Sequence, residues 1–222
     1  MYILYGGKFT RAMLVEMVLS EGDLAYELRE VDILKGGTRS SEILKINPRG
    51  LVPVLITPEG ETLVETPAIN LYLAERHKIT TLVPEIGDPL RGQFLSGLFY
   101  ITSHLEPALK RYWYAKRYGE GENEASSIRK RAYDEALECF RVIDKGLAEQ
   151  GPFHLGDTFS LVDLMLAFWD ISFDHGEVIS DLPAVSHCVE RVAARSKIRP
   201  FLQKQARWIR EFEDFGAEPE AI

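Results

Sequence analysis

Two short motifs carry groups that could hold a peptide-sized anion. Residues 47–55 read Asn-Pro-Arg-Gly-Leu-Val-Pro-Val-Leu, a Pro/Gly turn followed by a short apolar strand. Because proline cannot donate a ladder hydrogen bond, Pro53 is expected at a strand start or at a sheet edge. The cis form of an X–Pro bond costs only about 0.5–1 kcal/mol. A cis Pro53 would turn the backbone N–H and C=O of Val52 outward, free to pair with an extended ligand.

The second motif, Glu65-Thr66-Pro67-Ala68, is typical of a helix start. Thr66 is a good N-cap residue, and Pro67 is well placed at the first helical position. The first turn of a helix presents free N–H donors and the positive end of the helix dipole, which together favour a carboxylate. The two motifs therefore predict that an anionic peptide is held between a strand edge and a helix tip.

In this order and spacing, the motifs resemble those of the cytosolic glutathione transferases, in particular a bacterial, beta-like or related class. The patterns are N-P-x-G-x-V-P-x-L over 47–55 and E-[ST]-x-A-I-x-x-Y-L over 65–73. A third match, Gly-Asp-Thr-Phe-Ser-Leu-Val-Asp over 156–163, lies where that family has the signature of its C-terminal domain. The resemblance covers essentially the whole chain.

The resemblance implies a thioredoxin-like α/β domain with a mixed sheet over 1–80, a linker over 81–90 and an all-helical domain over 91–222. It implies that glutathione is the co-substrate, that its thiolate is added to a hydrophobic electrophile, and that the protein is a homodimer. Glutathione-dependent dehalogenation, ether cleavage or isomerisation, and a non-catalytic glutathione-binding module, stay open as alternatives.

The reaction needs a group that favours the ionised sulfur, since the thiolate is the nucleophile. One hydrogen bond from a hydroxyl or amide would suffice. Two candidates flank the loop between the first strand and the first helix. Tyr5 has the spacing of the tyrosine-type animal classes, which also carry an Arg-Ala pair six residues on, as in Arg11-Ala12. Thr10 lies where the beta class has its active cysteine, and it is slightly preferred. Tyr5 could equally be a core aromatic, and Thr10 a simple N-cap.

The same resemblance assigns the residues that would bind the tripeptide. Lys35 would pair with the glycyl carboxylate, and the backbone of Val52 would pair with the cysteinyl part. Glu65 would face the γ-glutamyl amine, and Thr66 the carboxylate beside it. Glu106 stands where the beta class typically has a histidine that faces the sulfur, which is a departure from that class.

The acceptor wall is expected on the first long helix of the second half. Residues 110–118 read Lys-Arg-Tyr-Trp-Tyr-Ala-Lys-Arg-Tyr, an aromatic and basic cluster. Aromatic rings can stack on a planar electrophile, and the cations could steer an acidic one. An amphipathic helix end with a solvated basic face would give the same pattern. The aromatic candidates are Phe99, His104, Tyr112, Trp113, Tyr114 and Tyr118.

Hydrophobic periodicity predicts the elements that must position these residues. In the first half it predicts strands over 2–5, 26–31, 54–57 and 62–64, and helices over 10–20, 41–45 and 66–77. This β-α-β-α-β-β-α order is typical of a small α/β domain. In the second half it predicts one continuous helical stripe from Leu95 to Tyr112, then helices over 126–149, from Ser160, and over 183–194 and 198–212. Ser160 and Asp163 form a capping-box pattern, so Asp163 is expected to be structural rather than catalytic.

Composition and charge limit the classes of function expected for this chain. The chain has 222 residues and a formal net charge of −8, which argues against nucleic acid as a partner. It has no apolar run long enough to span a membrane, and its N-terminus does not look like a signal peptide. Two cysteines suit a reducing, cytoplasmic setting rather than a disulfide framework. The five histidines lack the spacing of metal ligands, so no metal site is expected.

Overall fold

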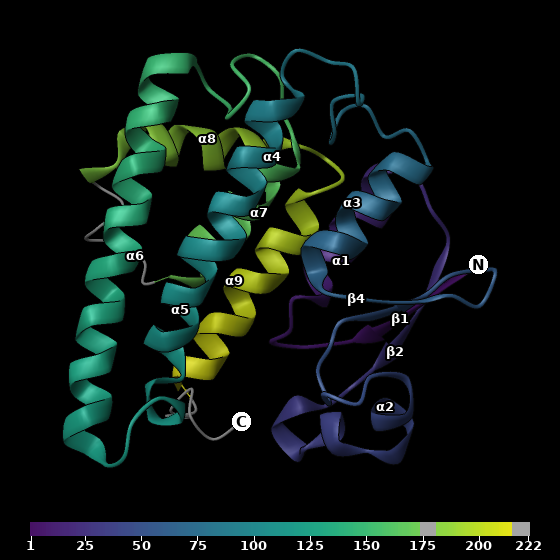
Figure 1. Cartoon of the computed structure of the whole chain (residues 1–222), viewed down its shortest axis with the longest axis vertical. Helices are drawn as coiled ribbons and strands as arrows, with labels where there is room; N and C mark the ends of the chain where they lie inside the picture. The colour runs from purple at the N-terminus through teal and green to yellow at the C-terminus, as the bar shows by residue number, and fades with distance from the viewer. Residues whose placement is uncertain (174–180, 215–222) are drawn as a thin grey trace.

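The computed structural model describes residues 1–173 and 181–214 (Figure 1). Its first half contains a four-stranded sheet in the order β2-β1-β3-β4. β1 is parallel to β2, and β3 is antiparallel to both β1 and β4. This mixed sheet confirms the predicted thioredoxin-like architecture. The strands are β1 (Tyr2–Gly6), β2 (Tyr26–Glu30), β3 (Val54–Ile56) and β4 (Thr62–Val64).

Helices cover both faces of the sheet. α1 (Ala12–Glu21) and α3 (Thr66–Arg76) pack together on one face, whereas α2 (Ser41–Ile46) lies on the other (Figure 1). Two short 3-10 turns, η1 (Ile33–Lys35) and η2 (Gly37–Arg39), precede α2. Along β1 the side chains alternate between the faces, as a strand requires.

The second half of the chain is helical, as predicted. Its helices are α4 (Arg91–Tyr100), α5 (Glu106–Trp113), α6 (Glu122–Gln150), α7 (Leu161–Ser172), α8 (Pro183–Ala194) and α9 (Arg199–Asp214). A π-helical turn, η3 (Ile101–Leu105), joins α4 to α5, and a 3-10 turn, η4 (Ala115–Arg117), follows α5.

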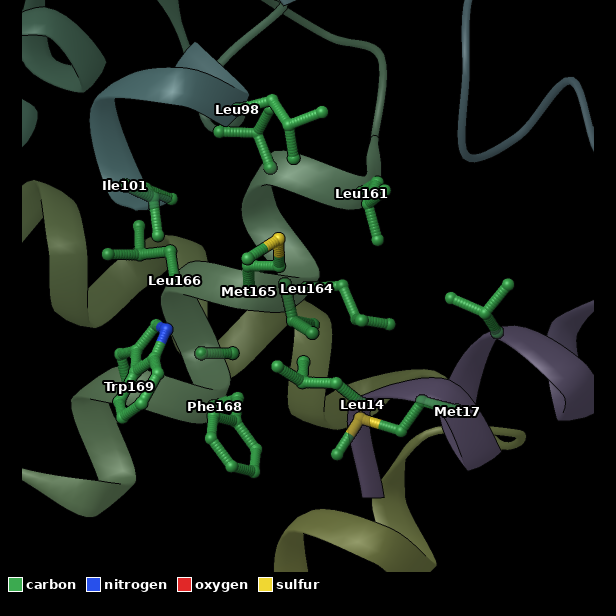
Figure 2. Close-up of a cluster of buried hydrophobic side chains, with 14 of the residues drawn as sticks. Leu14, Met17, Leu98, Ile101, Leu161, Leu164, Met165, Leu166, Phe168 and Trp169 are labelled. Atoms are coloured by element: carbon green, nitrogen blue, oxygen red, sulfur yellow. The ribbon is translucent and has the colours of Figure 1, made fainter. Parts of the chain in front are cut away.

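Helix α7 is the centre of the helical half. Every residue from Leu161 to Asp170 is buried, which is the pattern of a helix surrounded by protein on all sides. Leu14 and Met17 of α1 belong to the same apolar cluster as Leu164 and Met165 of α7 (Figure 2). One continuous core therefore joins the sheet half to the helical half.

The predicted helical stripe from Leu95 to Tyr112 is interrupted by the π-turn. The N–H of Glu106 donates to the carbonyl of Ile101, five residues back. The next residue, Pro107, has no N–H with which to continue the α-helical ladder. Leu98, Leu105 and Leu109 are nevertheless all buried. The turn changes the direction in which residues from Glu106 onward project, and this matters for the site described below.

The capping box at the start of α7 is confirmed. Ser160 Oγ accepts a hydrogen bond from the Val162 N–H at 3.3 Å, and the Asp163 carboxylate accepts one from the Ser160 N–H at 2.8 Å. Asp163 also accepts from the His154 N–H at 2.7 Å. The carboxylate is fully buried, so it ties the loop before α7 to the helix.

We predict that Asp163→Ala destabilises the fold by about 2–4 kcal/mol, because it leaves two buried N–H donors without an acceptor. Urea denaturation followed by circular dichroism measures the change. Asp157→Ala is the matched control, since Asp157 is an exposed aspartate in the same segment, and a change within about 0.5 kcal/mol is expected there. An equal effect of both substitutions would contradict the structural role of Asp163.

A second buried carboxyl group on α7, that of Asp170, makes the stability of the fold depend on pH. Asp170 is buried, and its Oδ1 atom makes no hydrogen bond within the described residues. Burial raises the pKa of Asp170 to about 7, because desolvation disfavours the charged form. The folded protein therefore binds a proton that the unfolded chain has lost. The free energy of unfolding should fall as the pH rises from about 4 to about 7.

We predict that Asp170→Asn removes this pH dependence. The variant should gain stability relative to the wild type at pH 8, by at most about 4 kcal/mol, and little at pH 4. Urea denaturation at pH 4, 5, 6, 7 and 8 gives the two curves. Parallel curves would show that Asp170 ionises normally in the fold.

Candidate functional site

A cleft of about 820 Å³ lies between the sheet half and the helical half. Its wall in the sheet half comes from the loop after β1, the turns η1 and η2, and the loop before β3. Its wall in the helical half comes from α5, η4 and the C-terminal parts of α7 and α9. The principal lining residues are Phe9, Thr10, Arg11, Thr38, Arg39, Arg49, Leu51, Val52, Lys110, Trp113, Tyr114, Arg117, Tyr118, Phe168, Trp169, Gln205 and Trp208.

The loop before β3 presents an unpaired backbone to this cleft. The Val52–Pro53 peptide bond is cis, as anticipated, and β3 begins at Val54. Within the described residues, neither the N–H nor the C=O of Val52 has a hydrogen-bond partner. Asn47 Nδ2 donates to the carbonyl of Leu51 at 2.8 Å, which holds the preceding turn. An extended ligand could therefore pair with Val52 as an added strand would.

The start of α3 differs from the prediction by one residue. Glu65, not Thr66, is the N-cap, and Thr66 is the first helical residue. The reason is the backbone of Glu65, whose φ of 67° turns the chain into the helix one position earlier. This φ is rare for a residue other than glycine, and such residues cluster at functional sites. The Thr66 side chain is 1% exposed, and its Oγ1 has no hydrogen-bond partner.

The helix tip nevertheless offers free donors. The first α-helical hydrogen bond of α3 runs from the Ile69 N–H to the Glu65 carbonyl. The N–H groups of Thr66 and Ala68 therefore precede the ladder, and Pro67 has none. The Glu65 carboxylate lies 3.7 Å from the guanidinium of Arg49, which lines the cleft. The tip is thus linked to the edge of the cleft.

Thr10 lines the cleft and is held rigidly. Its Oγ1 accepts hydrogen bonds from the N–H of Gly7 at 3.1 Å and from the N–H of Ala12 at 3.2 Å. The hydroxyl donates to the Gly7 carbonyl at 2.8 Å. A sulfur anion in the cleft would compete with this carbonyl for the hydroxyl proton. Thr10 is therefore in position to act on a ligand, and it also organises the loop.

Tyr5 lies outside the cleft, contrary to its predicted contact with the sulfur. It shares a cluster on the other face of the sheet with Ile43 of α2. Its hydroxyl donates to Glu42 at 3.0 Å and accepts from Arg29 at 2.6 Å. The cause is strand alternation, because Tyr5 and Leu4 must project to opposite faces. The geometry leaves Thr10 as the candidate of the two that reaches the cleft.

Lys35 does not line the cleft either. Its side chain is 85% exposed, and its ammonium lies 3.1 Å from the Asp32 carboxylate. Two arginines that the sequence analysis missed, Arg39 and Arg49, do line the cleft. Arg49 lies inside the Asn-Pro-Arg-Gly turn, so its place in that motif could have identified it from the sequence. No sequence motif identifies Arg39. The path of the backbone through η1 and η2 decides which basic residue of that segment faces the cleft.

A buried carboxylate holds two further cations at the cleft. Glu106 is 4% exposed, and it forms ion pairs with the Arg11 guanidinium and, at 2.9 Å, with the Lys110 ammonium. Both cations line the cleft. The sequence marked Glu106 only as a departure from the beta class. The π-turn that ends at Glu106 directs its side chain toward Arg11 of the other half.

The aromatic wall is partly as predicted. Trp113, Tyr114 and Tyr118 line the cleft. Tyr112 instead packs against Tyr133 and Phe173 in the core. Phe99 and His104 are exposed and do not line the cleft. Three aromatic residues from distant segments complete the wall, namely Phe168, Trp169 and Trp208.

The described residues offer no site for a reactive thiol or a metal ion, and no helix that could span a membrane. Burial raises the pKa of both thiols, Cys139 and Cys188, and neither lines the cleft. Among residues 1–173 and 181–214, no group of His, Cys, Asp and Glu could hold a metal ion. None of the described helices has the length and apolar character needed to cross a bilayer.

The fold and cleft agree with comparisons to known proteins. A model of the glutathione S-transferase N-terminal domain matches residues 12–76, and a model of the C-terminal domain matches residues 108–205. The glutathione S-transferase hmp2 of Hypomyces subiculosus is 35% identical over 167 residues, which are 72% of this chain and 77% of that protein. The chain belongs to the glutathione S-transferase family.

Two further comparisons found proteins that this chain resembles. The disulfide-bond oxidoreductase YfcG of Escherichia coli K12 is 28% identical over 82% of this chain and 85% of that protein. The crystal structure of a glutathione transferase homologue from Sulfitobacter, with bound glutathione, has a TM-score of 0.79 at 24% identity. The similarity covers 92% of this chain and 98% of the homologue's chain. It supports the shared fold.

We predict that Glu106→Gln destabilises the protein by about 1–3 kcal/mol, because Arg11 and Lys110 would then face each other without a carboxylate. Urea denaturation at low and high salt measures the loss, which should shrink as salt screens the two cations. Glu122→Gln is the control, since Glu122 pairs with Lys116 but is 80% exposed, and it should change stability by less than about 0.5 kcal/mol. A similar, small loss in both variants would contradict the assigned role of Glu106.

Proposed function

We propose that this protein is a glutathione transferase that adds the sulfur of glutathione to an electrophilic small molecule. The observation that carries the proposal is the unpaired N–H and C=O of Val52 at the edge of the cleft. A peptide ligand can use both groups in the manner of an added strand. Family membership supports glutathione as that peptide.

The residues around Val52 fit the charges of glutathione. Arg39 and Arg49 line the cleft and suit its two carboxylates, because a guanidinium can bind a carboxylate with two hydrogen bonds. We assign the glycyl carboxylate to Arg39 in place of Lys35, which does not line the cleft. The free N–H groups at the tip of α3 suit the γ-glutamyl carboxylate, and Glu65 suits the neighbouring amine.

Thr10 is the proposed sulfur-stabilising residue. Glutathione supplies a thiol whose ordinary pKa is about 8.5, and the reactive form is the thiolate. The Thr10 hydroxyl can donate to that sulfur if it rotates away from the Gly7 carbonyl. The adjacent Arg11 guanidinium, held by Glu106, adds positive charge on the same side of the cleft. Both effects favour the ionised sulfur.

We predict that Thr10→Val lowers kcat/KM for 1-chloro-2,4-dinitrobenzene by about 10- to 100-fold, since one donor to the developing charge is lost. Thr10→Ser should retain most of the wild-type kcat/KM. In both Thr10 variants the Kd for glutathione should change by less than about threefold. Tyr5→Phe keeps the packed ring outside the cleft and should leave the rate unchanged. If Thr10→Val keeps the wild-type rate, the assignment of Thr10 is wrong.

A calorimetric titration with glutathione in two buffers of different ionisation enthalpy tests the binding step separately. Binding with proton release is expected, because the site should favour the thiolate near neutral pH. Binding without proton release would favour a non-catalytic binding module. An absence of binding at millimolar glutathione would overturn the proposal.

Disulfide reduction is a second candidate, favoured by the similarity to the disulfide-bond oxidoreductase of Escherichia coli. No cysteine of this chain lines the cleft, so glutathione would have to supply both thiols. The disulfide substrate would be reduced while two glutathione molecules are oxidised to one disulfide. Turnover of a small disulfide, but not of an electrophile, would favour this candidate.

We also propose, from the family resemblance, that the protein is a homodimer. Sedimentation velocity at micromolar concentration distinguishes a dimer from a monomer of 25.2 kDa.

A further inference from the structure

The lining of the cleft has a charge opposite to that of the whole chain. The protein has a formal net charge of −8, yet the described lining of the cleft has five cationic side chains and no aspartate or glutamate. These cations are Arg11, Arg39, Arg49, Lys110 and Arg117. Such a concentration of one sign in a cleft attracts ligands of the other sign.

Arg39 and Arg49 belong to the proposed glutathione side of the cleft, and three other cations, Arg11, Lys110 and Arg117, line the rest of it. Two of these, Arg11 and Lys110, share the carboxylate of Glu106. Arg117, on the turn η4, has no carboxylate partner among the described residues. Its guanidinium lies 4.2 Å from the centroid of the Tyr114 ring. A full positive charge is therefore free to meet a ligand.

Aromatic side chains line the same cleft as this charge. Trp113 and Tyr114, which precede η4, and Trp208 of α9 all line the cleft. Phe9 extends the surface, since its ring centroid lies 6.2 Å from that of Trp208. Burial raises the pKa of Tyr114, so its phenol stays neutral. Aromatic rings in this arrangement favour a planar ligand that can stack on them.

From this arrangement we infer that the acceptor of this transferase is a planar electrophile that carries a carboxylate, and that Arg117 recognises the carboxylate. The inference rests on the proposed function, whose acceptor class it names. An uncharged acceptor would cover Arg117 and remove water without offering a partner, which costs free energy. A carboxylate would instead form a charge-assisted hydrogen bond with the guanidinium.

The test uses two glutathione S-conjugates that differ in one charge, so that it does not depend on turnover. The probes are the conjugates of ethacrynate, an aryl vinyl ketone with an oxyacetate group, and of its methyl ester. Both form by direct addition of the thiol. Calorimetry measures the Kd of each conjugate, and of glutathione itself, for the wild type and for Arg117→Gln.

We predict that the wild type binds the carboxylate conjugate about tenfold more tightly than the ester conjugate, the equivalent of one charge-assisted hydrogen bond. Arg117→Gln should abolish this preference and leave the Kd of the ester conjugate and of glutathione unchanged. Lys116→Gln is the matched control. It removes the same charge from the same turn at a side chain outside the cleft, and it should keep the preference.

Four results would overturn the inference. Equal affinity of the wild type for both conjugates would show that the acceptor charge is not recognised, while the proposed function would stand. A preference that survives in Arg117→Gln would remove Arg117 from the role. A weaker affinity for free glutathione in Arg117→Gln would place this arginine at the glutathione end instead. If neither glutathione nor either conjugate binds the wild type, the proposed function fails and the inference fails with it.

Discussion

The structure depends on the apolar contact between α1 and α7. Leu14 and Met17 from the sheet half and Leu164 and Met165 from the helical half belong to one core. Burying side chains of this size contributes about 1.5–3 kcal/mol each, so the two halves are held in one arrangement. This contact brings the loop after β1 opposite α5 and α9. The cleft exists because the two halves pack at their cores and separate at their edges.

The ion pair between Glu106 and Arg11 links the packing of the two halves to the charge of the cleft lining. Glu106 and Arg11 are 95 residues apart in the chain and meet across the junction of the halves. The buried carboxylate is costly on its own, and its two cationic partners compensate for that cost. The same carboxylate holds Arg11 and Lys110 at the cleft surface. Stability and electrostatics at this site therefore depend on one residue, which the π-turn directs inward.

The recognition of the two halves of the ligand differs in kind. The proposed glutathione side includes backbone groups, at Val52 and at the tip of α3, which depend on chain geometry more than on side-chain identity. The acceptor side is built from aromatic and basic side chains of α5, η4, α7 and α9. Substitution there can change the preferred electrophile without altering the tripeptide site. This division is consistent with a family whose members carry names for different reactions.

Local sequence predicted most of the elements and the capping box of Ser160 and Asp163, and it made a cis bond before Pro53 possible, because each depends on residues near one another in the chain. Tertiary structure decided which side chains share the cleft. Strand alternation directs Tyr5 away from it, and the path of η1 and η2 selects Arg39 over Lys35. The φ of Glu65 places the start of α3 one residue earlier than predicted. The packing of α9 against α7 places Trp208 at the cleft. Such choices depend on how distant segments pack, and the spacing within a motif does not specify them.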